Sequence, residues 1–162
     1  MSATLLAGSP APVASDIALA GRTVAPRPVP KLDASISGPL RARLRSAFDL
    51  AVQRVQEVES CSALFVPLRH DGVEMLRNTR YSVAAAAIAR DACSKQDIVA
   101  FTAVGSPATR VCASFQQLPP TAAAMIVLHE ALHFAGLRER PVHSDGLWPA
   151  EINALVRKGC GL

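Results

Sequence analysis

Apolar residues recur at three- and four-residue spacing between residues 40 and 58, which is the pattern of a helix that buries one face. The positions are Leu40, Leu44, Ala47, Phe48, Ala51, Val52, Val55 and Val58. Ser37, Gly38 and Pro39 come just before them and are typical of a helix start. The pattern therefore predicts a helix of about 20 residues.

Two short apolar runs follow this helix and predict a β-hairpin. Residues 63–66 form the first run, which Pro67 ends, and residues 73–76 form the second. Between them, Asp71 and Gly72 are a pair that accepts the positive φ angles of a tight turn. We therefore expect two strands joined by a turn in this segment.

A second hairpin is predicted further along the chain. Residues 98–104 and 109–115 read as two strands separated by a Gly-Ser-Pro turn, with Cys112 on the second strand. The alanine-rich stretch 81–90 precedes this hairpin. We expect it to be helical, because alanine has the highest helix propensity.

Residues 122–135 predict a second long helix. Thr121 offers an N-cap, and no Gly or Pro interrupts the segment before Gly136. Apolar residues lie all round this helix, so we expect it to be buried on most sides. A last helix is predicted to begin near Pro149 and to end before Gly159.

Composition divides the chain into a tail and one domain. The chain has 162 residues, of which 50% are hydrophobic, and this suffices for a single buried core. Residues 1–35 are rich in Ala, Pro and Ser and predict an irregular tail, a pro-segment or the remnant of an export signal. We expect residues 36–162 to form an α+β domain, with a long backing helix, a small mostly antiparallel sheet, a buried helix and a short C-terminal helix.

Charge and hydropathy exclude two classes of partner. The 17 Lys and Arg against 13 Asp and Glu give a net charge of +4, without any run of five basic residues. One Trp and one Tyr do not provide the stacking platforms of a nucleic-acid binder. The apolar runs fall far short of the roughly 20 residues that a membrane span needs. We therefore expect no nucleic-acid partner and no membrane span, and the oligomeric state stays open.

The four cysteines predict two disulfide bonds. Their spacing includes no CxxC pair and no zinc-ribbon pattern, since they stand at Cys61, Cys93, Cys112 and Cys160. Four cysteines allow three pairings, between which the sequence does not choose, and the alternative is that all four are reduced core residues. Disulfides imply an oxidising compartment, so we expect an exported protein, secreted or periplasmic, although residues 3–20 carry only a weak signal-peptide pattern.

The predicted buried helix contains the pattern HExxH. His129 and His133 lie one turn apart on one face, so both imidazoles can reach a single metal ion. Glu130 is rotated away from the ligand positions and can address a metal-activated water as a general base. The alternative is that the histidines only fill the core. Burial of unpaired imidazole and carboxylate groups is costly, which favours a metal site.

Residues 129–137 resemble the active-site helix of zincin metallopeptidases, and most closely the metzincin form HExxHxxGxx(H/D). In that family the glycine, here Gly136, lets the chain turn back to bring a third ligand to the zinc. The resemblance covers about 11 residues. It departs from the family because Glu139 stands where metzincins have His or Asp, and because no methionine follows Met125 to form the Met-turn.

The third ligand therefore has several candidates. We favour Glu139, since the turn at 136–137 makes it available. In gluzincins, which resemble thermolysin, the third ligand is a Glu on a later helix, which corresponds here to Glu151. An ordinary first-turn carboxylate that complements the helix dipole would also explain Glu151. His143 and Asp145 are the remaining candidates.

The resemblance implies a zinc-dependent metallopeptidase that acts on peptides or proteins, with His129 and His133 as ligands and Glu130 as the base. It also implies that an edge strand of the 98–115 hairpin pairs with an extended substrate. His143 or Tyr81 could stabilise the reacting carbonyl oxygen. The alternatives are a zincin-like protein that holds zinc without catalysis and an amidase acting on cell-wall peptides.

Overall fold

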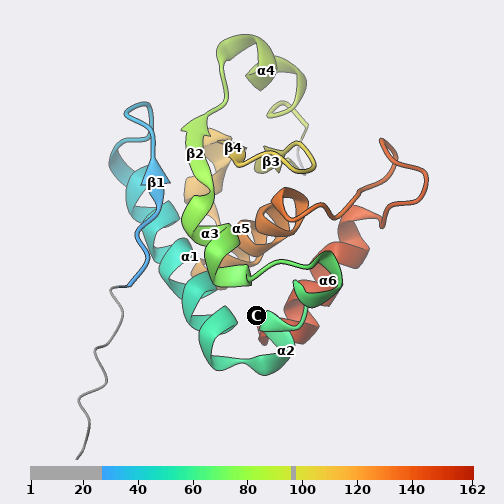
Figure 1. Cartoon of the computed structure of the whole chain (residues 1–162). Helices are drawn as coiled ribbons and strands as arrows, with labels where there is room; N and C mark the ends of the chain where they lie inside the picture. Colours follow the sequence, from blue (N-terminus) through green and yellow to red (C-terminus); the bar gives the residue numbers. More distant parts are fainter. Residues whose placement is uncertain (1–26, 96–97) are drawn as a thin grey trace, which may run out of the picture.

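The computed structural model describes residues 27–95 and 98–162, which form an α+β fold with a small mixed sheet (Figure 1). In chain order the elements are β1 (Lys31–Leu32), α1 (Gly38–Glu57), α2 (Glu59–Ser62), a 3-10 turn (Val66–Leu68), α3 (Gly72–Asn78), β2 (Arg80–Val83), α4 (Ala86–Asp91), β3 (Ala100–Thr102), β4 (Ala108–Val111), a second 3-10 turn (Ala113–Gln117), α5 (Pro120–Phe134) and α6 (Pro149–Cys160). No helix among the described residues has the length and hydrophobicity to cross a bilayer.

The sheet has the strand order β1-β2-β4-β3. The expectation of a mostly antiparallel sheet is wrong, since β1 with β2 and β2 with β4 are parallel, and only β3 with β4 is antiparallel. Long connections that contain helices join β1, β2 and β4, and such connections permit parallel pairing. The 98–115 hairpin is confirmed in a shorter form, with Cys112 just beyond the end of β4.

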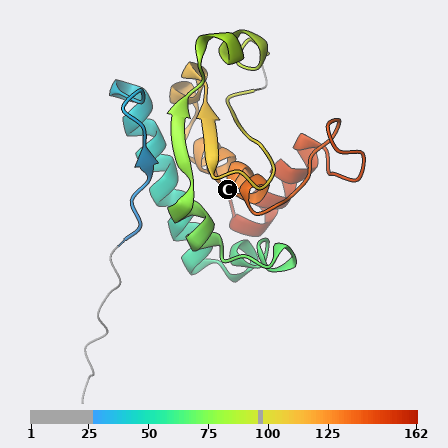
Figure 2. The same ribbon diagram turned by 45° about the horizontal axis from the view of Figure 1, so that its top comes forward.

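One face of the sheet packs on α1 and α5, which together carry half of the buried core residues (Figure 2). The predicted 20-residue helix is confirmed as α1, and its buried residues lie at the expected spacing. They are Leu40, Leu44, Ala47, Phe48, Ala51, Val52 and Val55. The second long helix is confirmed as α5. It begins at Pro120 with Pro119 as its N-cap, so the N-cap predicted for Thr121 is wrong.

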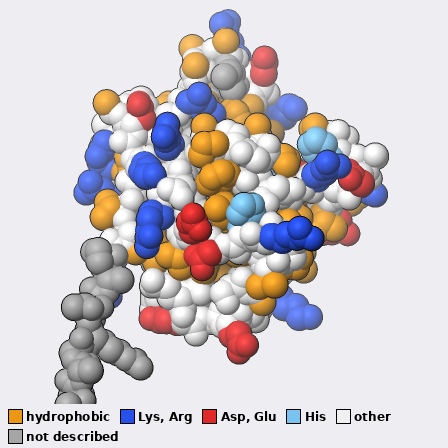
Figure 3. Space-filling view, viewed as in Figure 1, with side chains coloured by type: hydrophobic (Ala, Val, Ile, Leu, Met, Phe, Trp, Pro, Cys, Tyr) orange, Lys and Arg blue, Asp and Glu red, His pale blue; other side chains and the backbone are white. Residues whose placement is uncertain are grey.

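The opposite face of the sheet is polar and basic. Lys31, Arg80 and Arg110 lie there on three neighbouring strands, because side chains two residues apart point to the same side. Figure 3 shows Lys and Arg side chains gathered on this part of the surface, over β1, β2 and the start of α1. This solvated face lies on the other side of the sheet from α5.

The hairpin predicted for residues 63–76 is wrong, because this segment forms the turn after α2, a 3-10 turn and most of α3. The carboxylate of Asp71 accepts a hydrogen bond from the backbone N–H of Glu74 at 2.8 Å and so caps α3. A Cβ atom at Gly72 would lie 2.7 Å from the Phe65 ring and 2.9 Å from Val55. The Asp-Gly pair thus serves a helix cap and a close packing contact instead of a turn between strands.

The alanine-rich stretch 81–90 is divided between two elements. Residues 86–90 are helical in α4, as expected, but residues 81–83 belong to β2. β2 lies in the middle of the sheet, where Tyr81 is buried and Val83 pairs with Val111. Pairing on both sides overrides the local preference for helix.

The predicted tail extends too far into the domain. Residues 1–26 lie outside the described residues, but Lys31 and Leu32 form β1 and pair with β2. The backbone N–H of Asp33 also donates to Tyr81 O at 2.9 Å. The domain therefore begins before residue 36.

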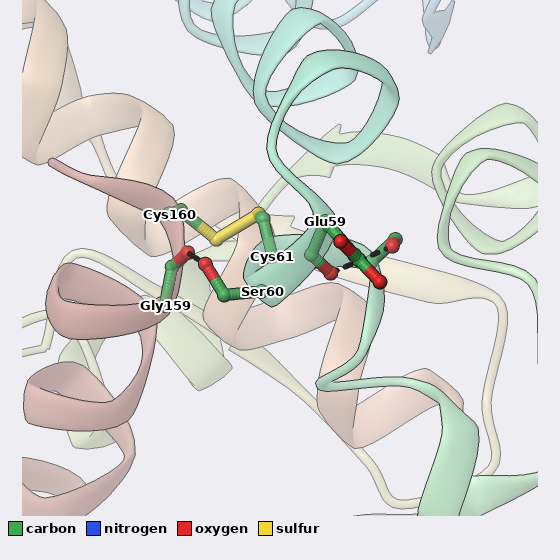
Figure 4. The surroundings of a disulfide bond; sticks show 6 residues. Glu59, Ser60, Cys61, Gly159 and Cys160 are labelled. Carbon is green, nitrogen blue, oxygen red and sulfur yellow. Dashed lines mark hydrogen bonds between the residues drawn. A yellow bond between two sulfur atoms is a disulfide. The ribbon is translucent and has the colours of Figure 1, made fainter.

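Two disulfide bonds are present, as predicted, so the alternative of four reduced cysteines is wrong. Cys61–Cys160 joins α2 to the end of α6 (Figure 4), and Cys93–Cys112 joins the segment after α4 to the end of β4. Beside the first bond, Ser60 Oγ donates to Gly159 O at 2.6 Å. Disulfides persist in oxidising compartments, so both bonds are consistent with an exported protein.

Candidate metal centre

Helix α5 carries His129 and His133 one turn apart on the same face. Both side chains are buried, with residue exposures of 6% and 5%. Their Nε2 atoms lie 3.0 Å apart, and the two rings meet edge to face with centroids 4.7 Å apart. The HExxH spacing therefore brings two nitrogen donors to one point in the interior.

Glu139 completes the group from outside the helix. α5 ends at Phe134, and Gly136 adopts a φ of 105°, which turns the chain back. Glu139 Oε2 then lies 2.9 Å from His129 Nε2 and 3.2 Å from His133 Nε2. These three residues form a group that could hold a metal ion.

The other ring nitrogen of each histidine is held by an acceptor. His129 Nδ1 donates to Asn153 Oδ1 on α6, and His133 Nδ1 donates to Leu137 O, both at 2.8 Å. A neutral imidazole with its proton on Nδ1 has a lone pair on Nε2. These contacts therefore orient both lone pairs toward the carboxylate of Glu139, as in histidine metal ligands.

Three electron-pair donors that converge in this way need a cation between them. Donors bound to tetrahedral zinc at about 2.0–2.1 Å lie about 3.3 Å from one another, which is close to the spacing of the three atoms here. Without a metal, a proton takes this place. Burial opposes charge on both groups, but mutual hydrogen bonds outweigh it. They raise the pKa of His133 and lower the pKa of Glu139 to about 2.

The segment 138–147 holds Glu139 in position. Its two ends pair through Arg140 N to Leu147 O at 2.8 Å and Leu147 N to Arg138 O at 3.1 Å. Gly146 packs directly against this backbone, since a Cβ atom there would lie 2.6 Å from Arg138 O and 2.7 Å from Glu139 N. The position of Glu139 thus depends on a residue without a side chain at 146.

We expect Gly146→Ala to weaken the binding of a divalent metal ion to this group by at least about tenfold, the lower range for loss of a group that orients a ligand. The added Cβ must displace the backbone that carries Glu139. Competition with a chromophoric chelator measures the affinity. Asp145→Ala is the matched control, because it removes only an exposed ion pair with Arg138 from the same loop. Equal affinity of Gly146→Ala and wild type would contradict this role of the loop.

Glu130 is buried beside the group of His129, His133 and Glu139 but is not part of it. The residue is 4% exposed, and its Oε2 atom has no hydrogen-bond partner among the described residues. Burial raises the pKa of this carboxyl group, and protonation of the neighbouring imidazoles of His129 and His133 opposes the shift. A buried carboxylate oxygen without a partner is costly, so such a group suggests a chemical role.

A cleft of about 310 Å³ opens beside these residues. His129, Glu130, His133 and Glu139 line it, together with strand β3. β3 is the last strand of the sheet and pairs only with β4 among the described strands. The backbone at this edge can therefore pair with an extended peptide in the cleft.

The other candidate ligands lie elsewhere. Glu151 Oε2 accepts a hydrogen bond from Trp148 N at 2.7 Å and caps α6, and Asp145 pairs with Arg138 at 2.7 Å. Neither His143 nor Tyr81 is among the described residues that line the cleft. Tyr81 is buried, and burial together with the charge of Glu130 raises the pKa of its hydroxyl.

Two contacts of the site were not predicted from the sequence. Asn153 directly follows the buried Ile152 on the amphipathic helix α6, which is an ordinary position for a polar residue, so the sequence gives no signal for this contact. The carbonyl of Leu137 has no signal either, because any residue supplies a carbonyl. A scan against models of protein families and searches of curated proteins and solved structures return no match to this chain.

Proposed function

We propose that the protein is a zinc-dependent metallopeptidase, in which His129, His133 and Glu139 hold the metal and Glu130 is the general base. One observation carries the proposal. Two Nε2 atoms and a carboxylate oxygen converge in a cleft next to Glu130, whose buried Oε2 atom has no hydrogen-bond partner among the described residues.

The donor set supports zinc. Two histidines and one carboxylate are a common ligand set of catalytic zinc, which keeps a further position for water or substrate. Zinc bound there would lower the pKa of its water toward about 7 and polarise the scissile carbonyl. Two histidines and one carboxylate also bind iron in oxygenases, but that chemistry does not require the carboxylate of Glu130.

Glu130 has the properties of a general base. It lies on α5 next to a metal ligand. Its raised pKa is closer to neutral pH than that of an ordinary glutamate, and proton transfer in both directions is efficient when the pKa is near the working pH. In the proposed reaction the carboxylate accepts the proton of the attacking water and delivers it to the leaving amine. The free edge of β3 orients the substrate by main-chain hydrogen bonds.

The two disulfides support action outside the cytoplasm. An exported peptidase meets unfolded proteins, peptides and cell-wall peptides as substrates. An amidase that cleaves cell-wall peptides would use the same residues, and a non-catalytic zinc protein would use the same ligands. The buried Oε2 atom of Glu130, which has no hydrogen-bond partner in the described part of the chain, favours catalysis over the last of these.

Removal of the metal tests the proposal. We expect the protein to cleave a fluorescently labelled unfolded protein, to lose this activity after treatment with a strong chelator and to regain it when stoichiometric zinc is added. Elemental analysis of the purified protein should find about one zinc per chain. Cleavage that survives complete metal removal would refute the proposal. Zinc without cleavage of proteins or cell-wall peptides would favour the non-catalytic alternative.

A further inference from the structure

Arg140 lies in the cleft immediately after the ligand Glu139. Apart from Glu130 and the group of His129, His133 and Glu139, Arg140 is the one described residue with a charged side chain that lines the cleft. The other lining side chains are mostly apolar: Ile98, Val99, Ala100, Phe101, Ile126, Pro141 and Pro149. Arg140 is exposed, and it is the one Lys or Arg among the described residues that line the cleft.

This guanidinium group is held on one side and available on the other. Its Nε donates to Ser144 O at 3.0 Å, and its Cζ lies 5.8 Å from the ring centroid of Trp148. Its two terminal nitrogens form no hydrogen bond to the described residues. Arg138, two residues earlier, differs, because its Nη1 pairs with Asp145 Oδ2 at 2.7 Å.

A held arginine with both terminal nitrogens available suits a carboxylate. The planar fork donates two parallel hydrogen bonds to the two carboxylate oxygens. Because Ser144 and Trp148 already restrict the side chain, little conformational entropy remains to be lost on binding.

We propose that Arg140 is a specificity residue that binds a carboxylate of the peptide substrate and selects peptides with this group beside apolar side chains. The inference rests on the proposed peptidase function and adds the class of substrate. The carboxylate can be an acidic side chain or the C-terminus of the peptide. The two sources share the same chemistry at Arg140 and differ in where the bond is cut.

Two sets of peptides distinguish the sources. The first set places Glu or Gln at each position in turn of acetyl-Ala-Ala-Phe-Ala-Ala-amide. The second compares the unsubstituted peptide with a free and an amidated C-terminus. A preference for Glu at one fixed position identifies a side chain, and a preference for the free terminus identifies the C-terminal carboxylate.

In the zinc-loaded wild type we expect the peptide with the preferred carboxylate to have a kcat/KM at least about tenfold above that of its uncharged counterpart, as for one charged hydrogen-bonded pair. Arg140→Gln should abolish this preference, mainly by raising KM for the carboxylate peptide, and Arg140→Lys should restore part of it. Arg138→Gln is the matched control and should keep the preference. Cleavage without any carboxylate preference in the wild type overturns the inference. So does an equal fall in kcat for all peptides in Arg140→Gln, which would mean that Arg140 stabilises the reacting carbonyl.

Binding without turnover separates this inference from the proposed function. The zinc-loaded Glu130→Gln protein should bind the carboxylate peptide at least about tenfold more tightly than the uncharged one in calorimetry, and the added Arg140→Gln change should remove the difference. If the zinc-loaded wild type cleaves no peptide but this difference in binding is found, the peptidase proposal fails and the role of Arg140 stands. Equal binding of both peptides overturns the role of Arg140 whether or not cleavage occurs.

Discussion

Glu139→Ala is expected to lose zinc, whereas Glu151→Ala is expected to retain it. Glu139 Oε2 lies within 3.2 Å of both histidine nitrogens, so its removal leaves two ligands on one helix. Loss of a group that only orients a ligand weakens metal binding about 10–100-fold. Loss of the ligand itself should therefore exceed about 100-fold. The measurement is zinc affinity by chelator competition, together with zinc per chain after gel filtration.

Glu151→Ala is a matched control with its own expected effect. Both residues are glutamates near the site, and both are candidates for a third ligand on sequence grounds. Glu151 Oε2 accepts a hydrogen bond from Trp148 N, so its removal should cost about 0.5–2 kcal/mol of stability as a lost helix cap. Zinc affinity should stay at the wild-type value. Unchanged zinc stoichiometry and affinity in Glu139→Ala would show that the third ligand is another residue.

The sequence predicts the two histidine ligands but does not decide between these two glutamates. The spacing of His129 and His133 fixes their relation, because one helical turn separates them in any α-helix. Glu139 reaches them only through a turn at Gly136 and the pairing of residues 138 and 140 with Leu147. That pairing depends on contacts between residues several positions apart, which no periodic pattern records.

The elements of the fold also differ in whether the sequence predicts them. Helix α1 and the hairpin of β3 and β4 follow from local periodicity and a local turn, and both are predicted correctly. Parallel pairing of β1, β2 and β4 joins segments that are far apart in sequence, so the sheet type is not predicted. Asp71 and Gly72 are compatible with both a hairpin turn and a helix cap. Packing of Gly72 against Phe65 decides in favour of the helix.

The position of His129 depends on a still more distant contact. Its Nδ1 partner Asn153 lies on α6, and the disulfide Cys61–Cys160 attaches the end of that helix to α2. The sequence predicts each part of this arrangement, the helix and the presence of disulfides, but neither the cysteine pairing nor the direction of the Asn153 side chain. The metal ligands can thus be proposed from a motif, whereas the groups that orient them require the structure.

Glu130→Gln is expected to bind zinc as tightly as the wild type and to cleave the unfolded protein substrate about 10²–10⁴-fold more slowly, which is the usual contribution of a general base. Glutamine has almost the same shape as glutamate but cannot accept the proton of the attacking water. Metal binding should persist because Glu130 does not belong to the group formed by His129, His133 and Glu139.

The same substitution should also leave the fold intact or stabilise it. Burial disfavours the charged form of Glu130 and raises its pKa, so the ionised carboxylate destabilises the metal-free protein at neutral pH relative to a neutral amide. This contribution disappears at low pH, where the carboxyl group of the wild type is protonated in both the folded and the unfolded state. Thermal unfolding of the two metal-free proteins between pH 4 and about pH 8 tests this, since the advantage of Glu130→Gln should grow as the pH rises. A variant that keeps its zinc and its stability but cleaves at the wild-type rate would exclude Glu130 as the base.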